Sequence, residues 1–254
     1  MPTLLYFKYD VLVVYLLYRQ LLATCTILGV ILTIAFYVKS KFAPKSALSN
    51  NGNSGNFLPD LLEGRETNPR IGSLDVKFLL FRVVCMSVII LNMIIIMKDI
   101  QGKSGVVRPT LLLAAALQIF YALDFVWFEE TYLTTYEYKY QGTGLMLIVG
   151  YITGAFYSLI HTRFIMNHGV ELQWYYLVLI ASLNLIGYII MRSANSQKHA
   201  FRTNPNDPAL AHLESIPTAS GSRLLVSSWW GFVRHPNYLG DILIQVSWGL
   251  LCGE

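Results

Sequence analysis

Five stretches of the sequence are apolar over a length that can cross a lipid bilayer, and they constrain the fold more than any other feature. They cover residues 21–38, 78–97, 110–128, 144–166 and 172–191. A bilayer core about 30 Å thick requires roughly 20 apolar residues in an α-helix, whose backbone polar groups are satisfied internally. A sixth apolar stretch, 238–252, is barely long enough to cross. The sequence therefore predicts an all-α, polytopic transmembrane helical bundle that forms one domain over residues 1–254.

We expect this bundle to be incomplete at both ends of the chain. The opening eighteen residues resemble the tail of an earlier helix, since Arg19 and Gln20 interrupt the apolar pattern before the first stretch. The last apolar stretch is short, and the chain stops at Glu254.

The composition agrees with a membrane protein. Hydrophobic residues make up 54% of the chain and charged residues only 13%, whereas soluble domains average about 25% charged residues. The net charge of +4 is too small and too dispersed to indicate nucleic-acid binding. Three cysteines without C-x-x-C spacing predict buried thiols, with no disulfide framework and no metal site.

Two long polar loops, 39–77 and 192–223, connect the apolar stretches. The first contains the runs SNNGNSGN and GRETNPRIG, neither of which has helical periodicity. Basic residues favour the cytoplasmic or nucleoplasmic side for both loops. An even number of spans separates them, which agrees with this orientation.

The densest polar chemistry lies in the run WWGFVRHPNYLGD, which precedes the last apolar stretch. Proline disfavours helical geometry in the residue before it and suits the first turn of a helix, so we expect a helix to begin at Pro236. Arg234 and His235 would then precede the free backbone N–H groups of a helix N-terminus, where an anion such as phosphate binds. The alternative is a basic loop that contacts lipid headgroups.

The fifth apolar stretch continues into polar sequence with no helix breaker before Pro205. A helix over 172–202 would be roughly 46 Å long and would project beyond the bilayer. Asn195, Lys198 or His199, and Arg202 would share one face of it, where cations one turn apart suit the phosphates of a dinucleotide. No Rossmann or P-loop motif is present. The alternative is a solvated basic flank.

Three carboxylates lie in or next to the third apolar stretch. Asp124 is inside it, where a charge costs about 2.5–3.5 kcal/mol on insertion scales and usually marks a functional site. Apolar surroundings favour the protonated form, which can act as an acid. The alternatives are a helix-end residue for Asp124 and solvated side chains for Glu129 and Glu130. His161 and Arg163, near the end of the fourth stretch, are expected to be structural or to reach the interface.

Four motifs resemble those of the sterol reductase family, which includes delta14-sterol reductase, 7-dehydrocholesterol reductase and the membrane domain of the lamin B receptor. They are GRETNPRIGSLDVKF (64–78), D-x-x-W-x-E-E-x-x-LTT (124–135), RSANSQKHAFRTNPNDP (192–208) and LLVSSWWGFVRHPNYLGD (224–241). Their order and number make the resemblance specific, and it extends from about Lys41 to the last residue. The likeness is strongest to the branch that contains the lamin B receptor and delta14-sterol reductase.

The resemblance implies a multi-pass protein of the endoplasmic reticulum or nuclear inner membrane that reduces the C14 double bond of a sterol with NADPH. An acid protonates the double bond, NADPH delivers hydride, and Asp124, Glu129 and Glu130 are the implied catalytic carboxylates. The sterol occupies a pocket that faces membrane lipid. The family's cofactor residues correspond here to Asn195, Lys198, Arg202, Trp230, Arg234, His235, Asn237, Tyr238 and Asp241.

The chain departs from the family pattern on the sterol side. Tyr136, Glu137 and Tyr138 stand where the family usually reads Met-Asp-Ile, and Tyr151 replaces the aspartate of a Gly-Asp pair. These departures favour an alternative, a catalytically weakened, lamin-B-receptor-like anchor that meets nuclear envelope proteins through regions absent here. A membrane methyltransferase also shares R-H-P-x-Y-x-G, but it predicts neither the GRE-x-NPR loop nor the ANSQK run.

Overall fold

The computed structural model describes residues 13–102, 106–218, 221 and 223–253. Most of the expected tail of an earlier helix, residues 1–12, lies outside the described residues, and the short helix α1 (Val13–Leu16) follows it. The chain forms two compact units. The first comprises Met1–Glu129 and Thr135–Gly169, and the second comprises Glu130–Thr134 and Val170–Glu254.

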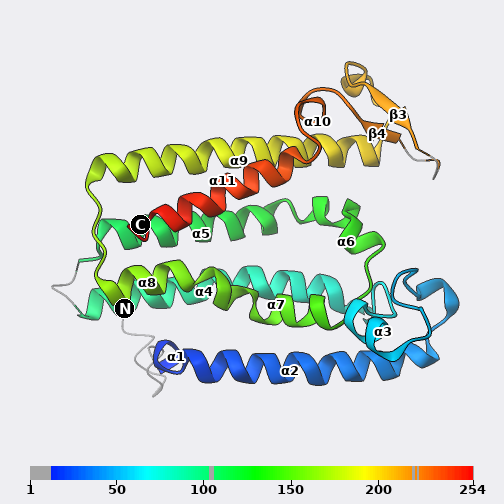
Figure 1. Ribbon diagram of the computed structural model, residues 1–254, viewed down its shortest axis with the longest axis horizontal. Coiled ribbons are helices and arrows are strands. Elements are labelled where there is room, and N and C mark those ends of the chain that lie inside the picture. Colours follow the sequence, from blue (N-terminus) through cyan, green and yellow to red (C-terminus); the bar gives the residue numbers. More distant parts are fainter. Residues whose placement is uncertain (1–12, 103–105, 219–220, 222, 254) are drawn as a thin grey trace. The chain divides into compact units, whose positions relative to one another are not determined.

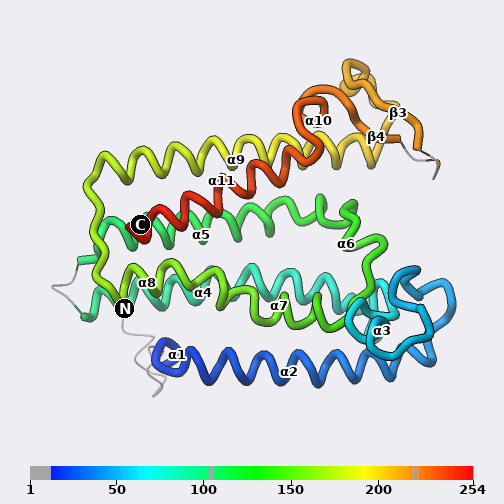
Figure 2. Tube along the Cα trace, viewed as in Figure 1, coloured from blue at the N-terminus to red at the C-terminus, as the bar shows by residue number. Residues whose placement is uncertain are grey.

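The first unit is a bundle of long apolar helices. Its main helices are α2 (Tyr18–Lys39), α4 (Val76–Gly102), α5 (Pro109–Trp127), α7 (Leu145–Ser158) and α8 (Ile160–His168). Helix α4 packs against both α5 and α7, and α2 lies along α7 although they are far apart in the sequence (Figure 2). Phe36, Val76, Leu80 and Ile148 form the buried cluster between α2, α4 and α7.

The fourth apolar stretch is bent, where the sequence predicts one uninterrupted segment. Helices α7 and α8 are separated at Leu159, whose N–H still bonds to the carbonyl of Ala155 at 3.2 Å. The hydroxyl of Ser158 donates to the carbonyl of Gly154 at 3.3 Å. A serine that bonds to the carbonyl four residues earlier is one known source of helix bends, although Thr33 makes the same bond to Gly29 at 2.7 Å within the unbroken α2.

The first polar loop has more regular structure than its sequence predicts. It contains the 3-10 turns Ser40–Phe42 and Lys45–Ala47, the helix α3 (Phe57–Glu63), and a hairpin of β1 (Arg70–Ile71) and β2 (Leu74–Asp75). After α3, Gly64 has a φ of 88°, and a Cβ there would lie 2.1 Å from the backbone nitrogen of Gly144. Backbone packing on this segment, and not hydrophobic periodicity, therefore shapes the loop.

The second unit is built on two helices, α9 (Trp174–Thr203) and α11 (Pro236–Leu250), which pack along each other (Figure 1). At their contact, a Cβ on Gly187 would lie 2.7 Å from the carbonyl oxygen of Gly240. Asn184 donates to the hydroxyl of Ser247 at 2.7 Å in the same interface. Small residues let the two backbones approach closely, and a polar pair adds a hydrogen bond, as is common between membrane helices.

Smaller elements complete the two units. They are η4 (Glu129–Thr134), α6 (Tyr136–Lys139), η5 (Pro208–Leu210), β3 (Ser215–Pro217), β4 (Arg223–Leu225) and α10 (Trp229–Phe232). Within the described residues, five helical segments are long and apolar enough to cross a membrane. The all-α, polytopic fold class predicted from the sequence is confirmed, as are the long helix through residue 202 and the helix start at Pro236.

Candidate functional site

The last turns of α9 carry the first group of predicted cofactor residues. Lys198 donates from Nζ to Oδ1 of Asn195 at 3.2 Å, and its ammonium lies 5.6 Å from the ring centroid of Trp230. Trp230 in turn donates from Nε1 to the carbonyl of Ala194 at 3.3 Å. The lysine is thus held between a helical amide and an aromatic face, both of which favour the cation. Residues separated by more than thirty positions thus meet here.

The loop between α9 and α10 holds Trp230 in this place. Strands β3 and β4 pair antiparallel, and Val226 continues the contact by donating its N–H to the carbonyl of Glu214 at 3.0 Å. Ser228 then adopts a φ of 54°, which is costly for a residue with a side chain. A Cβ on Gly231 would lie 2.7 Å from the carbonyl oxygen of Val226. The backbone is therefore tightly folded where α10 reaches α9.

The second group of predicted cofactor residues lies at the start of α11. Arg234 and His235 are exposed and precede the helix, and the His235 ring stacks on Tyr238 with centroids 5.1 Å apart. No hydrogen bond or ion pair joins the Arg234 side chain to a described residue. Asn237 is buried, and its Oδ1 has no hydrogen-bond partner within the described chain. Asp241, one turn further on, is half-buried and engaged in contacts within the chain.

Arg202 completes the set, and it shows a contact that sequence reasoning missed. Its Nη1 donates to the carbonyl of Thr134 at 2.6 Å, and the Thr134 hydroxyl lies 3.1 Å from Nδ1 of His199. The sequence left Lys198 and His199 as alternatives on one face. In the structure Lys198 meets Trp230, whereas His199 meets Thr134. The LTT run, which follows the predicted carboxylates, contains Thr134 and was the sequence signal available for this contact.

The three predicted catalytic carboxylates have different surroundings. Asp124 is only 5% exposed, near the end of α5, and Glu130 is exposed in η4. Glu129 receives two hydrogen bonds from Arg82, at 2.7 Å from Nε and 2.5 Å from Nη2. This guanidinium holds the pKa of Glu129 below its usual value. Asp124 and Glu129 belong to the first unit, whereas Glu130 and all the predicted cofactor residues belong to the second.

The second unit therefore presents donors that suit a phosphorylated ligand. Lys198, Arg202 and Arg234 supply positive charge, and the buried Asn237 has hydrogen-bonding capacity that no described residue uses. The exposed ring of Tyr238 and the indole of Trp230 offer flat apolar surfaces for a heterocycle. No group of three or more metal-ligating side chains occurs among the described residues.

Known proteins resemble the chain over nearly its full length. The model of the Ergosterol biosynthesis ERG4/ERG24 family matches residues 2–254. "Delta(14)-sterol reductase LBR" of Gallus gallus is 38% identical over 99% of this chain and 40% of that protein. "Delta(14)-sterol reductase TM7SF2" of Mus musculus is 41% identical over 90% of this chain and 55% of that protein. "Delta(14)-sterol reductase erg24" of Schizosaccharomyces pombe is 36% identical over 93% of this chain and 56% of that protein. The chain thus spans about half the length of the curated relatives it matches.

Proposed function

Because the chain belongs to the Ergosterol biosynthesis ERG4/ERG24 family, we propose that it acts in sterol biosynthesis as a membrane oxidoreductase that reduces the C14 double bond of a sterol with NADPH. The observation that carries the proposal is the meeting of Lys198, Asn195 and Trp230 at the end of α9. The names of the relatives support the reaction and the substrate class. The endoplasmic reticulum or nuclear inner membrane is the proposed location.

The proposed cofactor residues divide into two roles. Lys198, Arg202 and Arg234 would hold the phosphates, since a dinucleotide phosphate carries several negative charges and charge-assisted hydrogen bonds are the strongest available. Asn237 would bond the ligand through its buried amide, and Trp230 would contact a ring. When bound, NADPH supplies the hydride that reduction of a carbon–carbon double bond requires.

The carboxylates would supply the proton and stabilise positive charge on the sterol. Asp124 is the proposed acid, because it is the most buried of the three carboxylates and lies near the end of a membrane-spanning helix. Glu129 is held ionised by Arg82 and is therefore suited to electrostatic stabilisation and not to proton donation. Glu130 remains exposed, and its proposed role is also electrostatic.

The binding part of the proposal is tested with Arg234→Gln in the full-length protein. Loss of a charge-assisted contact should weaken NADPH binding roughly 10- to 100-fold in a calorimetric titration. Arg223→Gln is the matched control, since Arg223 is also an exposed arginine of the second unit but lies on β4. Equal affinity of wild type and Arg234→Gln would contradict the assignment.

The catalytic part is tested with Asp124→Asn, which keeps the size of the side chain and removes its acid. Turnover of a C14-unsaturated sterol should fall by about 10²-fold or more, while NADPH affinity stays unchanged. Unchanged turnover would show that Asp124 is not the acid and has a structural role instead. Affinity and turnover are measured on the same preparation, so a folding defect would be recognised by loss of both.

A second function, a non-catalytic membrane anchor, is favoured by the segment that departs from the family pattern. Tyr151 donates its hydroxyl to the carboxylate of Glu137, and Tyr138 donates to Asp75 at 2.9 Å. The side chains at these departures thus serve the fold of the first unit. Expression of the full-length protein in a reductase-deficient cell separates the two functions, since an anchor leaves the accumulated C14-unsaturated sterol unchanged.

A further inference from the structure

The first polar loop exposes three large apolar side chains close to the end of α2. Phe42 is 87% exposed in the 3-10 turn that follows α2. Phe57 and Leu58 are 60% and 61% exposed in the first turn of α3. A group of large apolar side chains on a surface usually marks contact with a partner or a membrane.

Hydrogen bonds from the preceding turn fix the orientation of α3. Asp60 is 2% exposed, and its carboxylate accepts hydrogen bonds from the backbone N–H and the hydroxyl of Ser54, at 2.7 and 2.8 Å. The N–H of Gly55 donates to the same carboxylate at 3.2 Å. The side of α3 that carries Asp60 therefore faces the protein, whereas Phe57 and Leu58 stay on the outside.

An aromatic contact fixes the depth of α3 along α2. The rings of Tyr37 and Phe57 meet edge to face, with their centroids 5.2 Å apart. Tyr37 belongs to the segment Tyr18–Phe42, which is long and apolar enough to cross a membrane. It lies two residues before Lys39, the first charged residue of α2 after Arg19. Phe57 is thus held at the level of the apolar span, and α3 lies beside the end of α2 (Figure 1).

The exposed apolar surface of α2 continues into this region. Ile27, Ile31, Ile34 and Val38 share one face of α2, and all four are exposed. Phe42 continues the series four residues after Val38. In a helix that crosses a membrane, such a face contacts lipid.

Basic side chains lie next to the exposed aromatic rings. Lys41 and Lys45 are both exposed, and the Lys41 ammonium lies 4.7 Å from the ring centroid of Tyr37. Lysines that flank exposed phenylalanine and leucine are typical of protein segments at the level where acyl chains meet phosphates.

We infer that the apolar surface formed by Phe42, Phe57 and Leu58 inserts into the membrane beside α2, at the boundary between acyl chains and phospholipid headgroups. Phospholipid is the partner because the surface continues the lipid-facing side of α2 and because Phe57 contacts the spanning segment itself. The start of the first polar loop is then a membrane-surface element and not a solvated connection. The inference is independent of the proposed reaction, because it uses no residue assigned to cofactor or catalysis.

The experiment is fluorescence quenching of the full-length protein reconstituted in phosphatidylcholine vesicles. The native cysteines are replaced, and a thiol-reactive fluorophore is attached at Leu58→Cys or, separately, at Phe42→Cys. Phosphatidylcholine brominated near the carboxyl end of its acyl chains should quench both probes at least about threefold more than a probe at Asn50→Cys. Asn50 is the matched control, because it is an exposed residue of the same loop within the polar run SNNGNSGN. Ile31→Cys, on the exposed face of α2, provides the reference for a position that faces lipid.

Iodide in the aqueous phase identifies the other surroundings that this surface could have. A probe at position 58 that only iodide quenches would lie in water, and a probe that neither quencher reaches would be covered by protein. Either result would overturn the inference, whereas quenching by brominated lipid at positions 58 and 42, and mainly by iodide at position 50, supports it. Thermal unfolding of each labelled protein reports whether the fold persists. If the fluorophore at position 58 lowers the unfolding midpoint, the probe at position 42 alone decides.

Discussion

Lys77 in the first unit and Arg234 in the second are both cations, but the chain treats them in opposite ways. Lys77 is fully buried, and its ammonium donates to the carbonyls of Glu137 and Gln141 at 2.7 and 2.6 Å. Arg234 is exposed and bonds to no described residue. The Lys77 ammonium bonds to acceptors within the fold, whereas the Arg234 side chain has donors that no described residue uses. Unfolding and binding measurements should therefore separate the two kinds of residue.

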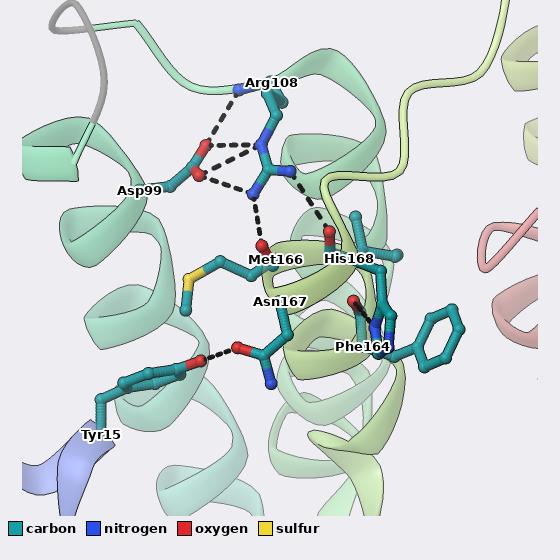
Figure 3. A network of polar contacts seen from close by, with 8 residues as sticks. Tyr15, Asp99, Arg108, Phe164, Met166, Asn167 and His168 are labelled. Atoms are coloured by element: carbon teal, nitrogen blue, oxygen red, sulfur yellow. Dashed lines mark hydrogen bonds and ion pairs between the residues drawn. The ribbon is translucent and has the colours of Figure 1, made fainter.

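The largest effect on stability is expected for Arg108→Met in the first unit. It removes the guanidinium that balances the buried Asp99 carboxylate (Figure 3), and breaking a buried ion pair typically costs about 3–5 kcal/mol. The midpoint of chemical unfolding in one detergent should fall accordingly. Arg19→Met, at an exposed position, is the matched control. An unchanged midpoint would show that water or lipid reaches Asp99 freely.

A smaller loss is expected for Lys77→Met, which keeps the length of the side chain. Two half-buried carbonyls lose their donor, and an unsatisfied buried polar group costs about 1–3 kcal/mol, so we expect a loss at the lower end of this range. The same unfolding measurement applies, with the exposed Lys139 changed to Met as the control. If Lys77→Met and Lys139→Met both unfold at the wild-type midpoint, the bonds of Lys77 do not support the fold, and the contrast between Lys77 and Arg234 fails.

The ion pair of Arg82 and Glu129 should make a modest, pH-dependent contribution to stability. The hydrogen bonds from Arg82 lower the pKa of Glu129 in the folded chain, so the contribution is present above its ordinary pKa of about 4.5 and is lost as the pH falls through the lower, folded value. Solvent screening limits it to about 1 kcal/mol or less, because the Arg82 side chain is 51% exposed. Unfolding midpoints of wild type and Glu129→Gln should differ at pH 7 and converge in acid.

The smallest effect on stability is expected for Arg234→Gln. An exposed side chain without partners should change the free energy of unfolding by no more than about 0.5 kcal/mol, although the same variant is expected to weaken NADPH binding. A large drop in the unfolding midpoint would mean that Arg234 supports the fold, and the distinction drawn above would no longer hold at that position.

Local sequence rules predicted the elements of the second unit well. The preference of proline for the first turn of a helix predicted the start of α11. The absence of a helix breaker before Pro205 predicted the full length of α9. These features depend on residues near one another in the chain or on a shared helix face, which periodicity and spacing can express.

Features that depend on long-range backbone contact could not be predicted in this way. Helix α3 and the position of Gly64 follow from the fit of one loop against the backbone of Gly144, and no pattern within residues 39–77 encodes that partner. The contact of Thr134 with His199 likewise depends on tertiary structure. The break at Leu159, between α7 and α8, falls within a continuous apolar stretch, so hydrophobic periodicity does not predict it.

The glycine contact between α9 and α11 has a mechanical consequence for the loop before Pro236. A Cβ on Gly240 would lie 2.4 Å from the backbone nitrogen of Met191, so even one methyl group there would push α9 and α11 apart. Pro236 is one helical turn from Gly240. If α11 tilted at this contact, Pro236 would move, and so would Trp230 and Arg234, which precede it. The size of the side chain at position 240 therefore influences the direction of the Trp230 and Arg234 side chains, although they lie before the helix.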